Sequence, residues 1–477
     1  MIPLRLAEVA AATGGTVDPA YADVVVDGPV VVDSRQVAAG SLFGAVLGER
    51  VDGHDFVLDA ATRGAAAALV ARPVGVTPCV VVRDVVDALG RLATYVLASL
   101  REGGVPRVIG ITGSSGKTST KDVVAQVLVR DGEVVAPAGS YNNEIGLPLT
   151  VLRASAATRH LVLEMSARGV GHIAALCVVA PVEVGVVLNV GSAHVGEFGS
   201  REAIARAKSE LLDGIVAGGA AVLNVDDAMV AAMRTRPDVR RIGVGCGETA
   251  DVRARDVALD AGGRPAFTVV AAQGEGRVRL RLVGAHHVGN ALAAVAVGLE
   301  AGLSIDVVTD AVSSAVPRSR WRMEMRQTAD GVTVINDAYN ANPESMRAAL
   351  EALVLVGRGR RTWAVLGHLA ELGEETPAAH AEVGRLCATL GVDHVVAVGE
   401  LAAGVAESAA AGGVDAVRVD DVDGAVGVLT GRLSDGDVVL VKASRSAGLE
   451  RVADALAPQR AQKPQNPQKS ENPEEAA

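Results

Sequence analysis

The sequence predicts an α/β protein of three domains with mostly parallel sheets. Its 477 residues are enough for more than one domain at about 100–200 residues each. Short runs rich in Val, Ala and Leu alternate with helical stretches, as in sheets whose parallel strands are buried on both faces. Gly- and Pro-containing segments at 101–106 (REGGVP) and 315–321 (AVPRSRW) interrupt this alternation twice. The expected parts of the chain are therefore domains at 1–105, 106–316 and 317–458 and a Pro-, Gln- and Glu-rich disordered tail at 459–477.

Each domain contains its own candidate strands. In the first they alternate with short helical runs, and in the second and third they are short apolar runs bounded by turn residues. The strand candidates are 24–35 and 79–84 in the first domain, 107–112, 160–166, 182–190, 220–226 and 240–245 in the second, and 332–339, 361–367, 394–399 and 437–442 in the third.

Composition and charge exclude several classes of protein. Aromatic residues make up only 2% of the chain, which argues against stacking platforms for single-stranded nucleic acid. The net charge of −11 disfavours a general binder of nucleic-acid phosphates. The N-terminal run lacks the layout of a signal peptide, and no segment has the roughly 20 uninterrupted apolar residues of a membrane span. We therefore expect a cytoplasmic protein that binds no nucleic acid, does not insert into a membrane, and carries reduced, mostly buried thiols at Cys79, Cys177, Cys246 and Cys387.

The run ITGSSGKTST at 111–120 is the most specific local signal. A strand that leads into Gly-Lys-Thr at a helix start presents backbone N–H groups and the positive end of the helix dipole to an anion. Lys117 can reach the outer phosphates of a nucleotide, and the Thr118 hydroxyl can coordinate Mg²⁺. The loop is a variant of the common phosphate-binding pattern, because Ile111 stands where that pattern has glycine. The alternative is a Gly/Ser turn with an exposed lysine.

Three further residues of the second domain are candidates for the same site. Glu164 ends a strand, His194 lies in the loop after the next strand, and Lys208 lies in a helical run. Taken singly, they can equally be a surface acid, a surface or structural histidine, and a solvated helix face. In an open α/β sheet, ligands bind beyond the carboxyl ends of the strands, so the fold would gather Lys117, Glu164 and His194 at one edge. Such a cluster favours phosphoryl transfer.

Several longer runs are informative as whole segments: GITGSSGKTSTK, NNEIGLP, LEMSARGVGHI, NVGSAHVGEFGS and AKSEL in the central domain, DSRQVAAGSLFGAVLGERVDGHDF in the first domain, and NDAYNANPESMRAAL, AVLGHLAELGEET and VKASRSAGLE in the third. These runs resemble the Mur ligases, the ATP-dependent amide ligases that build the peptidoglycan stem peptide in the cytoplasm. The DNPR motif typical of the family member that adds diaminopimelate is absent. The outer runs are most similar to the member that joins D-alanyl-D-alanine to UDP-N-acetylmuramoyl-tripeptide.

The resemblance implies a small UDP-binding α/β domain, a central P-loop-type ATPase domain and a C-terminal Rossmann-like domain. It also implies that ATP phosphorylates the terminal carboxylate of the tripeptide and that the dipeptide amine then displaces phosphate. Lys208 matches the lysine that is carbamylated in this family, and His194 would help to hold a second Mg²⁺ beside the one at Thr118 and Glu164. The implied ATP-binding residues are Gly113, Ser114, Ser115, Gly116, Lys117, Thr118, Ser119, Asn290, Arg322 and Asp337. The implied catalytic residues are Lys117, Lys208, His194 and Arg322.

The resemblance also places the other substrates. Ser34 and Arg35 would contact the UDP-sugar, with the segment 48–54 nearby. His380 and the loop 368–374 would border the dipeptide site. The run EMSARG at 164–169 departs from the EMGAN of many relatives, which affects local loop contacts. The complete set of implied substrate residues is Ser34, Arg35, His54, Asn143, Tyr339, Asn340 and Asn342.

Two alternatives to this reading remain open. A folylpolyglutamate synthase would use the same chemistry on a pterin substrate, but such enzymes lack the DSR…DGHDF domain. A nucleotide-binding regulatory protein, or a catalytically silent relative, would not need Lys117, Glu164, His194 and Lys208 together. The expected enzyme is a monomer that binds ATP, two Mg²⁺ ions, UDP-N-acetylmuramoyl-tripeptide and D-alanyl-D-alanine.

Overall fold

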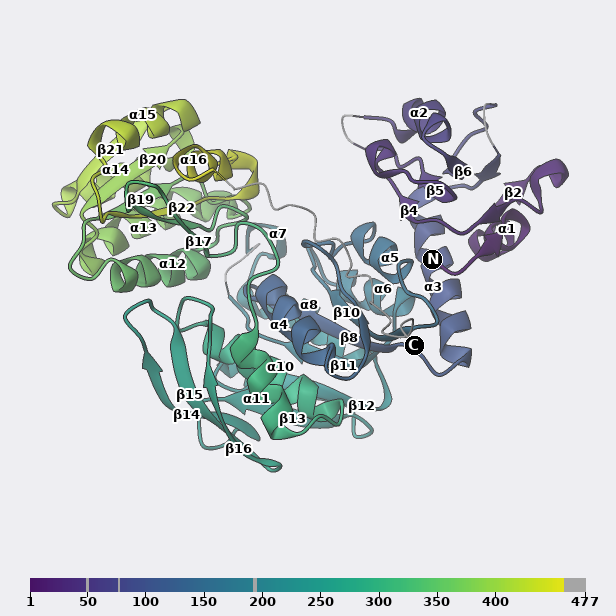
Figure 1. Ribbon diagram of the computed structural model, residues 1–477, viewed down its shortest axis with the longest axis horizontal. Helices are drawn as coiled ribbons and strands as arrows, with labels where there is room; N and C mark the ends of the chain where they lie inside the picture. The colour runs from purple at the N-terminus through teal and green to yellow at the C-terminus, as the bar shows by residue number, and fades with distance from the viewer. Residues whose placement is uncertain (49–50, 76–77, 192–194, 459–477) are drawn as a thin grey trace, which may run out of the picture.

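The computed structural model describes residues 1–48, 51–75, 78–191 and 195–458 (Figure 1). Three α/β units follow one another along the chain, with sheets of five, nine and six strands. The first and third units lie apart, each beside the central one (Figure 1). This arrangement confirms the predicted class of three α/β domains with mostly parallel sheets.

The N-terminal unit contains a five-stranded sheet in the order β2-β7-β6-β5-β4 and a separate β1–β3 pair. Strands β4 to β7 are parallel, and β2 joins the edge antiparallel to β7. The predicted strand at 24–35 is two separate two-residue strands, because Gly28 and Pro29 interrupt it. The elements are β1 Leu4–Arg5, α1 Leu6–Thr13, β2 Thr16–Val17, β3 Val25–Val26, β4 Val30–Val31, β5 Ser41–Gly44, α2 Val57–Thr62, β6 Ala65–Val70, β7 Cys79–Val81 and α3 Val85–Glu102.

Helix α3 joins the first unit to the second. Asp84 caps its first turn by accepting a hydrogen bond of 2.9 Å from Asp87 N. Its apolar face belongs to one continuous cluster that includes both the first unit's core and one face of the central sheet. Arg101 near its C-terminus pairs with Glu183 of β11 at 2.6 Å. The helix is therefore packed against both units rather than spanning solvent between them (Figure 1).

The central sheet has the order β16-β15-β14-β13-β12-β11-β8-β10-β9. In this sheet order, all neighbouring strands between β14 and β9, with β8 among them, pair in parallel. Strands β14, β15 and β16 form an antiparallel extension. The strand elements are β8 Arg107–Thr112, β9 Glu133–Val135, β10 Thr158–Glu164, β11 Val182–Val187, β12 Ile215–Asn224, β13 Arg240–Gly245, β14 Val252–Leu259, β15 Pro265–Ala271 and β16 Gly274–Arg279. The helices are α4 Lys117–Leu128, α5 Gly146–Val151, α6 His172–Val179, α7 Val195–Phe198, α8 Arg201–Asp213, α9 Ala228–Ala231, α10 His287–Glu300 and α11 Ile305–Ser314.

Strand β8 lies at the point where the order of the central sheet reverses. The chain leaves β8 through α4, returns on one side as β9 and β10, and then crosses to the other side as β11. In register, Glu164 of β10 lies beside Ile111, and Val187 of β11 lies beside Thr112. The carboxyl ends of three neighbouring strands thus meet at one edge, where open α/β sheets bind their ligands.

The third unit has a six-stranded sheet in the order β17-β18-β22-β19-β20-β21, parallel except for β17. Apolar clusters cover both of its faces. Its elements are β17 Glu324–Gln327, β18 Thr333–Asn336, α12 Pro343–Val356, β19 Thr362–Leu366, α13 Thr376–Leu390, β20 His394–Val398, α14 Ala403–Ala411, β21 Asp415–Val419, α15 Val422–Arg432, β22 Val438–Lys442 and α16 Glu450–Leu456.

The cysteines are less uniformly buried than the sequence predicts. Cys177 and Cys387 are buried, Cys79 is half-buried and Cys246 is exposed. The prediction of mostly buried thiols is wrong for Cys246, because it follows β13 at the end of a short strand rather than lying within one. The predicted tail at 459–477 lies outside the described residues.

Candidate active site

The loop between β8 and α4 is shaped for an anion. Gly116 precedes the first turn of α4 with a φ of 80°, a left-handed conformation that favours glycine. A Cβ at this position would lie 2.7 Å from Asn290 Oδ1. The Asn189 side chain holds the loop, since its Oδ1 accepts from Ser115 N at 2.9 Å and its Nδ2 donates to Ser115 O at 3.2 Å. The first turn of α4 therefore directs its free backbone N–H groups toward this loop.

Lys117 lies over the same loop. Its Nζ donates a hydrogen bond of 2.7 Å to Gly113 O, which folds the side chain back toward the helix start. Burial lowers the pKa of Lys117, and the nearby Glu164 carboxylate partly offsets this effect. A lysine in this place holds a positive charge beside the helix N-terminus, where phosphate oxygens would lie.

Oxygen atoms gather beside Lys117. Thr118 Oγ1 donates a hydrogen bond of 3.0 Å to Glu164 Oε2 and lies 2.9 Å from Ser140 Oγ. Asn142 Nδ2 donates to the other oxygen of Glu164 at 2.8 Å. Glu164 is 1% exposed, so its carboxylate is fixed inside the site rather than solvated at the surface. The alternative of a surface acid is wrong.

Lys208 is buried on α8, with 5% of its surface exposed. Burial and the positive charge of Lys117 hold the pKa of Lys208 well below its ordinary value. The alternative of a solvated helix face is therefore wrong. His194 lies outside the described residues.

Arg322 reaches this cluster from the segment that precedes β17. Its Nη2 donates to Thr118 Oγ1 at 3.2 Å and lies 3.5 Å from Ser140 Oγ. The guanidinium stacks on the Tyr339 ring, 4.2 Å from the ring centroid. Among the described residues, Arg322 Nε is buried without a hydrogen-bond partner. A buried donor of this kind is costly unless a ligand satisfies it.

The run DAYNANP contributes a second group of polar contacts. Asp337 pairs with the buried Lys442, with 2.6 Å between Oδ2 and Nζ, and Lys442 also donates to Asn340 O at 2.9 Å. Asn342 caps α12 through Ser345 N and extends its Nδ2 to Ser114 O at 3.4 Å. This run thus connects the third unit to the phosphate loop.

Asn290 lies close to Gly116 of the phosphate loop, in the first turn of α10. It is buried, and its Nδ2 lies 3.3 Å from His287 Nδ1. Burial and the charge of the neighbouring His286 hold the pKa of His287 well below its ordinary value, so this ring is neutral and its Nδ1 can accept the bond.

A cavity of about 660 Å³ opens between the second and third units at this edge of the central sheet. The Arg168 and His172 side chains line it from the central unit, and Glu371 and Arg445 line it from the third. The other lining residues are Ser114, Lys117, Ser140, Asn142, Asn143, Glu144, Glu164, Ser166, Ala167, Arg322, Tyr339, Asn340, Ala370, Ser444 and Ser446.

The residues expected to bind the UDP-sugar lie away from this cavity, in the N-terminal unit. Ser34 is buried, whereas Arg35 is exposed and donates 2.7–3.2 Å hydrogen bonds to Asp33. His54 is buried and uses both ring nitrogens: its Nε2 accepts from Ala71 N at 2.9 Å, and its Nδ1 lies 2.7 Å from Asp52. The His54 ring therefore holds its own loop in place, and contact with substrate at these residues stays a prediction.

His380 is also a structural histidine. Leu369 N donates to its Nε2 at 3.1 Å, and its Nδ1 lies 2.7 Å from Thr376 O. The ring fixes the loop whose Ala370 and Glu371 line the cavity, but His380 itself does not line it. The prediction that this loop borders the dipeptide site stays open.

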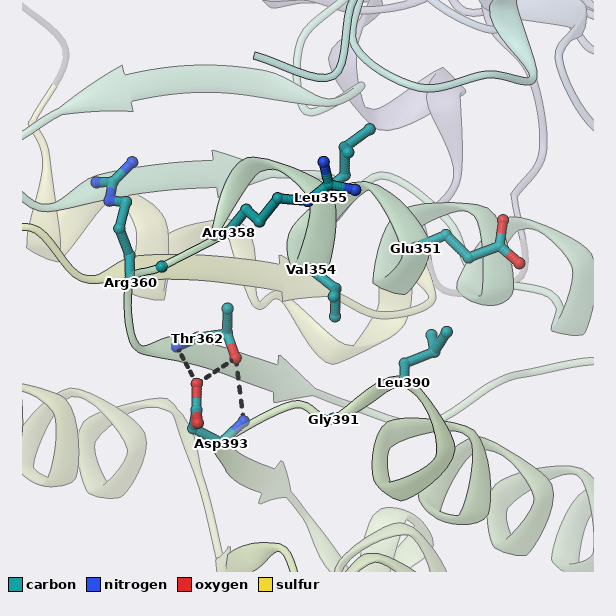
Figure 2. Close-up of a pocket in the computed structure, with 11 residues that line it drawn as sticks. Glu351, Val354, Leu355, Arg358, Arg360, Thr362, Leu390, Gly391 and Asp393 are labelled. Atoms are coloured by element: carbon teal, nitrogen blue, oxygen red, sulfur yellow. Dashed lines mark hydrogen bonds between the residues drawn. The ribbon is translucent and has the colours of Figure 1, made fainter. Parts of the chain in front are cut away.

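A second cavity of about 540 Å³ lies at the opposite, amino-terminal edge of the third sheet (Figure 2). Its wall includes Thr362 at the start of β19, which accepts and donates hydrogen bonds with Asp393. Arg360 on its rim donates to Thr333 and to the backbone of the 436–437 turn. Its described lining includes no residue of the phosphate loop.

Several residues of the site were not among the sequence-predicted contacts. Ser140 has no recognisable motif and is found only through the fold. The others lie inside recognised runs: Asn142 in NNEIGLP, Asn189 in NVGSAH, and Lys442 and Arg445 in VKASRS. A search for polar residues in the last two positions of predicted strands could have found Asn189 and Lys442.

The described residues contain no group of three or more His, Cys, Asp or Glu side chains arranged to hold a metal ion. Within the same residues, no helix combines the length and apolar character needed to cross a bilayer.

Comparison with known proteins identifies the relatives of this chain. The Mur ligase family, catalytic domain, matches residues 29–95, the Mur ligase middle domain matches 111–298, and the Mur ligase, glutamate ligase domain, matches 321–445. The chain is 49% identical to the UDP-N-acetylmuramoyl-tripeptide–D-alanyl-D-alanine ligase of Mycobacterium tuberculosis (strain ATCC 25618 / H37Rv), over 96% of this chain and 98% of that protein. It is 34% identical to the protein of the same name from Escherichia coli (strain K12), over 91% and 94%.

Solved structures agree. Crystal structure I of MurF from Acinetobacter baumannii superimposes with a TM-score of 0.85 at 32% identity, covering 95% of this chain and 98% of that one. MurF ligase from Thermotoga maritima in complex with ADP gives 0.76 at 32% identity, covering 90% and 97%. Similarity of this extent spans all three units and the site between them. The chain belongs to the Mur ligase family.

Proposed function

We propose that this protein joins D-alanyl-D-alanine to UDP-N-acetylmuramoyl-tripeptide with consumption of ATP, giving the UDP-linked pentapeptide, ADP and phosphate for peptidoglycan synthesis. The full-length similarity to ligases of that name carries the proposal. The geometry supports it, because a phosphate-binding loop and a cavity large enough for further substrates share one edge of the central sheet.

The residues of the site fit a nucleotide. The start of α4, Lys117 and the unsatisfied Nε of Arg322 offer hydrogen-bond donors and positive charge in one place. Such groups satisfy phosphate oxygens and stabilise the charge that develops during phosphoryl transfer. Asn290 and Asp337 flank this place and are the proposed contacts for the adenosine portion.

The donor set also fits Mg²⁺. Thr118 and Glu164 present a hydroxyl and a fixed carboxylate about one hydrogen-bond length apart, and oxygen ligands are those that Mg²⁺ prefers. When bound, Mg²⁺ neutralises charge on the phosphates. Lys208 is buried near Lys117, so a carbamate on its amine would replace a buried cation with an anion suited to a second ion. His194 is the other proposed ligand there.

The chemistry proposed for the substrates has two stages. The tripeptide carboxylate first attacks the terminal phosphorus of ATP, the bond from that phosphorus to the bridging oxygen breaks, and ADP leaves with the electron pair, while Lys117 and Arg322 hold the phosphate oxygens in line. The dipeptide amine then attacks the carbonyl carbon of the acyl phosphate and gives up a proton to solvent, the C–O bond breaks, and phosphate leaves with its electron pair. The phosphate makes a far better leaving group than an oxide, which is why the carboxylate must be activated first.

The cavity between the second and third units is the proposed meeting place of the two peptide substrates. Asn143, Tyr339, Asn340 and Asn342 would contact them from its walls and rim, and Ser34 and Arg35 would bind the UDP end on the first domain. We propose the domain limits 1–105, 106–316 and 317–458, a monomeric state and a cytoplasmic location.

Phosphate release tests this function. The purified protein is incubated with ATP, Mg²⁺ and UDP-N-acetylmuramoyl-tripeptide, and acceptors are compared: D-alanyl-D-alanine, single amino acids and glutamate. We expect release that depends on the dipeptide. Release with a single amino acid instead would place the protein elsewhere in the family, and no release with any acceptor would refute the proposed activity.

A further inference from the structure

One face of helix α4 runs along the segment that connects the second and third units. Thr118, Asp122 and Gln126 are four residues apart and therefore share one face of the helix. Each contacts the connecting segment in antiparallel order. Thr118 accepts a hydrogen bond from Arg322, and Asp122 accepts hydrogen bonds from Ser319 and Arg318. Gln126 donates one hydrogen bond to Val316 and accepts another from it. Helix α4, which begins at the phosphate loop, thus also binds the segment that connects the second and third units.

Asp122 makes the densest of these contacts. Its Oδ2 accepts from Ser319 N at 2.8 Å and from Arg318 N at 3.2 Å, and its Oδ1 accepts from Ser319 Oγ at 3.1 Å. Lys121 supports it, because its Nζ lies 2.6 Å from Asp122 Oδ1 and donates to Ser319 Oγ and to Pro137 O. Asp122, Lys121 and Ser319 are all buried. Hydrogen bonds to a buried charge are stronger than those between neutral groups.

The other end of the connection is tied to the third unit. Met323 N donates a hydrogen bond of 3.0 Å to Asp337 Oδ1, and Asp337 is itself paired with Lys442. Only three residues, 320–322, lie between the anchor at Ser319 and the anchor at Met323. Trp321 and Met323 have φ values of 58° and 50°, a left-handed conformation that is unfavourable for large side chains. The segment 320–322 is short and its backbone is strained, so its conformation can change little while both anchors hold.

We propose that Asp122 is a positioning residue for phosphoryl transfer: by anchoring Ser319 to α4, it places Arg322 in the phosphate pocket. Arg322 lies three residues after that anchor and reaches Thr118 one turn before Asp122 on the same helix. The guanidinium therefore occupies the pocket only while Ser319 stays in register on α4. This inference rests on the proposed function for the identity of the reaction, but the placement of Arg322 beside a bound nucleotide can be measured without any ligation.

The first test uses binding of MgADP, measured by calorimetry on the full-length protein. Asp122→Asn leaves one acceptor where the carboxylate offered two, so at least one anchoring bond is lost. We expect affinity for MgADP to fall about tenfold, the scale set by the loss of a hydrogen bond to a charged group. Gln126→Ala is the matched control, because it removes two hydrogen bonds from the same helix to the same segment, one turn farther from Arg322. It should change affinity by less than about twofold.

The second test asks whether Asp122 acts through Arg322. In a double-mutant cycle, Asp122→Asn should weaken binding in the wild-type background and have little further effect in Arg322→Ala. If the two losses simply add, Asp122 does not act through Arg322 and the proposal is wrong. The same cycle on turnover should show the loss in kcat as well as in the KM for ATP.

Stability must be separated from positioning, because Asp122→Asn leaves Lys121 charged and buried. Ser319→Ala keeps that ion pair and removes only the hydroxyl bonds, and Lys121→Met combined with Asp122→Asn removes both charges. We expect each variant to weaken MgADP binding while remaining folded. Folded variants with unchanged affinity would overturn the inference. A wild-type protein that binds MgADP without ligating would refute the proposed function and leave this inference standing.

Discussion

Arg322 and Thr118 are separated by 204 residues in the chain, and Arg322 Nη2 donates a hydrogen bond of 3.2 Å to Thr118 Oγ1. Thr118 belongs to the helix that follows the phosphate loop, whereas Arg322 belongs to the start of the third unit. The phosphate site is therefore built by two units together, and any relative movement of the two changes it. The following predictions test separate parts of this arrangement.

Replacing Lys117 should abolish turnover without unfolding the protein. Lys117→Met keeps much of the side-chain volume and removes the charge beside the helix start. We expect kcat for ATP consumption to fall at least about 100-fold, as when one preorganised donor to a developing negative charge is removed. Thermal unfolding without nucleotide should be nearly unchanged, because within the part of the chain that the structure describes the Lys117 amine donates its hydrogen bond to its own loop, at Gly113 O. Activity close to wild type would rule out the assigned phosphate site.

Glu164 should set the requirement for Mg²⁺. Glu164→Gln keeps the shape but removes the negative charge from the oxygen cluster with Thr118. The Mg²⁺ concentration for half-maximal activity should rise about tenfold or more, measured by phosphate release across a Mg²⁺ titration. Glu351→Gln, on the exposed rim of the other cavity (Figure 2), is the control and should leave the titration unchanged. An unshifted titration in Glu164→Gln would remove Glu164 from the metal site.

The four thiols should differ sharply in reactivity. Burial raises the pKa of Cys177 and of Cys387 to about 12, so at pH 8 only about one in ten thousand of either is thiolate. Cys246 is exposed. A thiol reagent followed by peptide mass spectrometry should modify Cys246 first and leave Cys177 and Cys387 intact until denaturant is added. Cys246→Ser should remove the fast phase, and rapid native-state labelling of Cys387 would contradict the packing of α13.

Acid should destabilise the protein through His287. Burial and the charge of His286 hold the pKa of His287 well below its ordinary value. The unfolded chain takes up a proton near pH 6.5 and the folded one does not, so the stabilisation is complete above that pH and is lost as the pH falls below it. The slope from this residue is at most about 1.4 kcal/mol per pH unit.

Urea unfolding at pH values between about 7.5 and 5.5 measures this effect. His287→Gln removes the titrating ring, so its free energy of unfolding should depend less steeply on pH than that of the wild type. Parallel curves for the two proteins would show that His287 does not contribute.

The sequence predicts the parallel parts of this fold better than the rest. The runs 107–112 and 182–190 are mostly apolar, and they contain β8 Arg107–Thr112 and β11 Val182–Val187, which are largely buried. The antiparallel extension β14–β16 was missed, because its strands carry many charged residues on an exposed face and no helices separate them. Several strands of the first unit are only two residues long, which is too short to produce a periodic pattern of apolar residues.

The candidate site shows the same division. Lys117 and Glu164 were found because each follows a strand, and a parallel sheet places such residues at one edge. The roles of Asp122 and Ser140 depend on contacts with segments distant in sequence, which no local pattern encodes. Sequence likewise gives no sign that His54 and His380 have hydrogen-bond partners at both ring nitrogens, because Ala71 and Leu369 lie 17 and 11 residues away from them. Contact of either residue with substrate stays a prediction.

Oxygen transfer from the acceptor tests the central claim most directly. UDP-N-acetylmuramoyl-tripeptide labelled with ¹⁸O in its terminal carboxylate is incubated with ATP, Mg²⁺ and D-alanyl-D-alanine. The masses of the pentapeptide product and of the inorganic phosphate are then measured by mass spectrometry. The account predicts a UDP-linked pentapeptide that retains one carboxylate oxygen as the new amide carbonyl, and inorganic phosphate that carries the other. Unlabelled phosphate, or phosphate release without a pentapeptide, would contradict it.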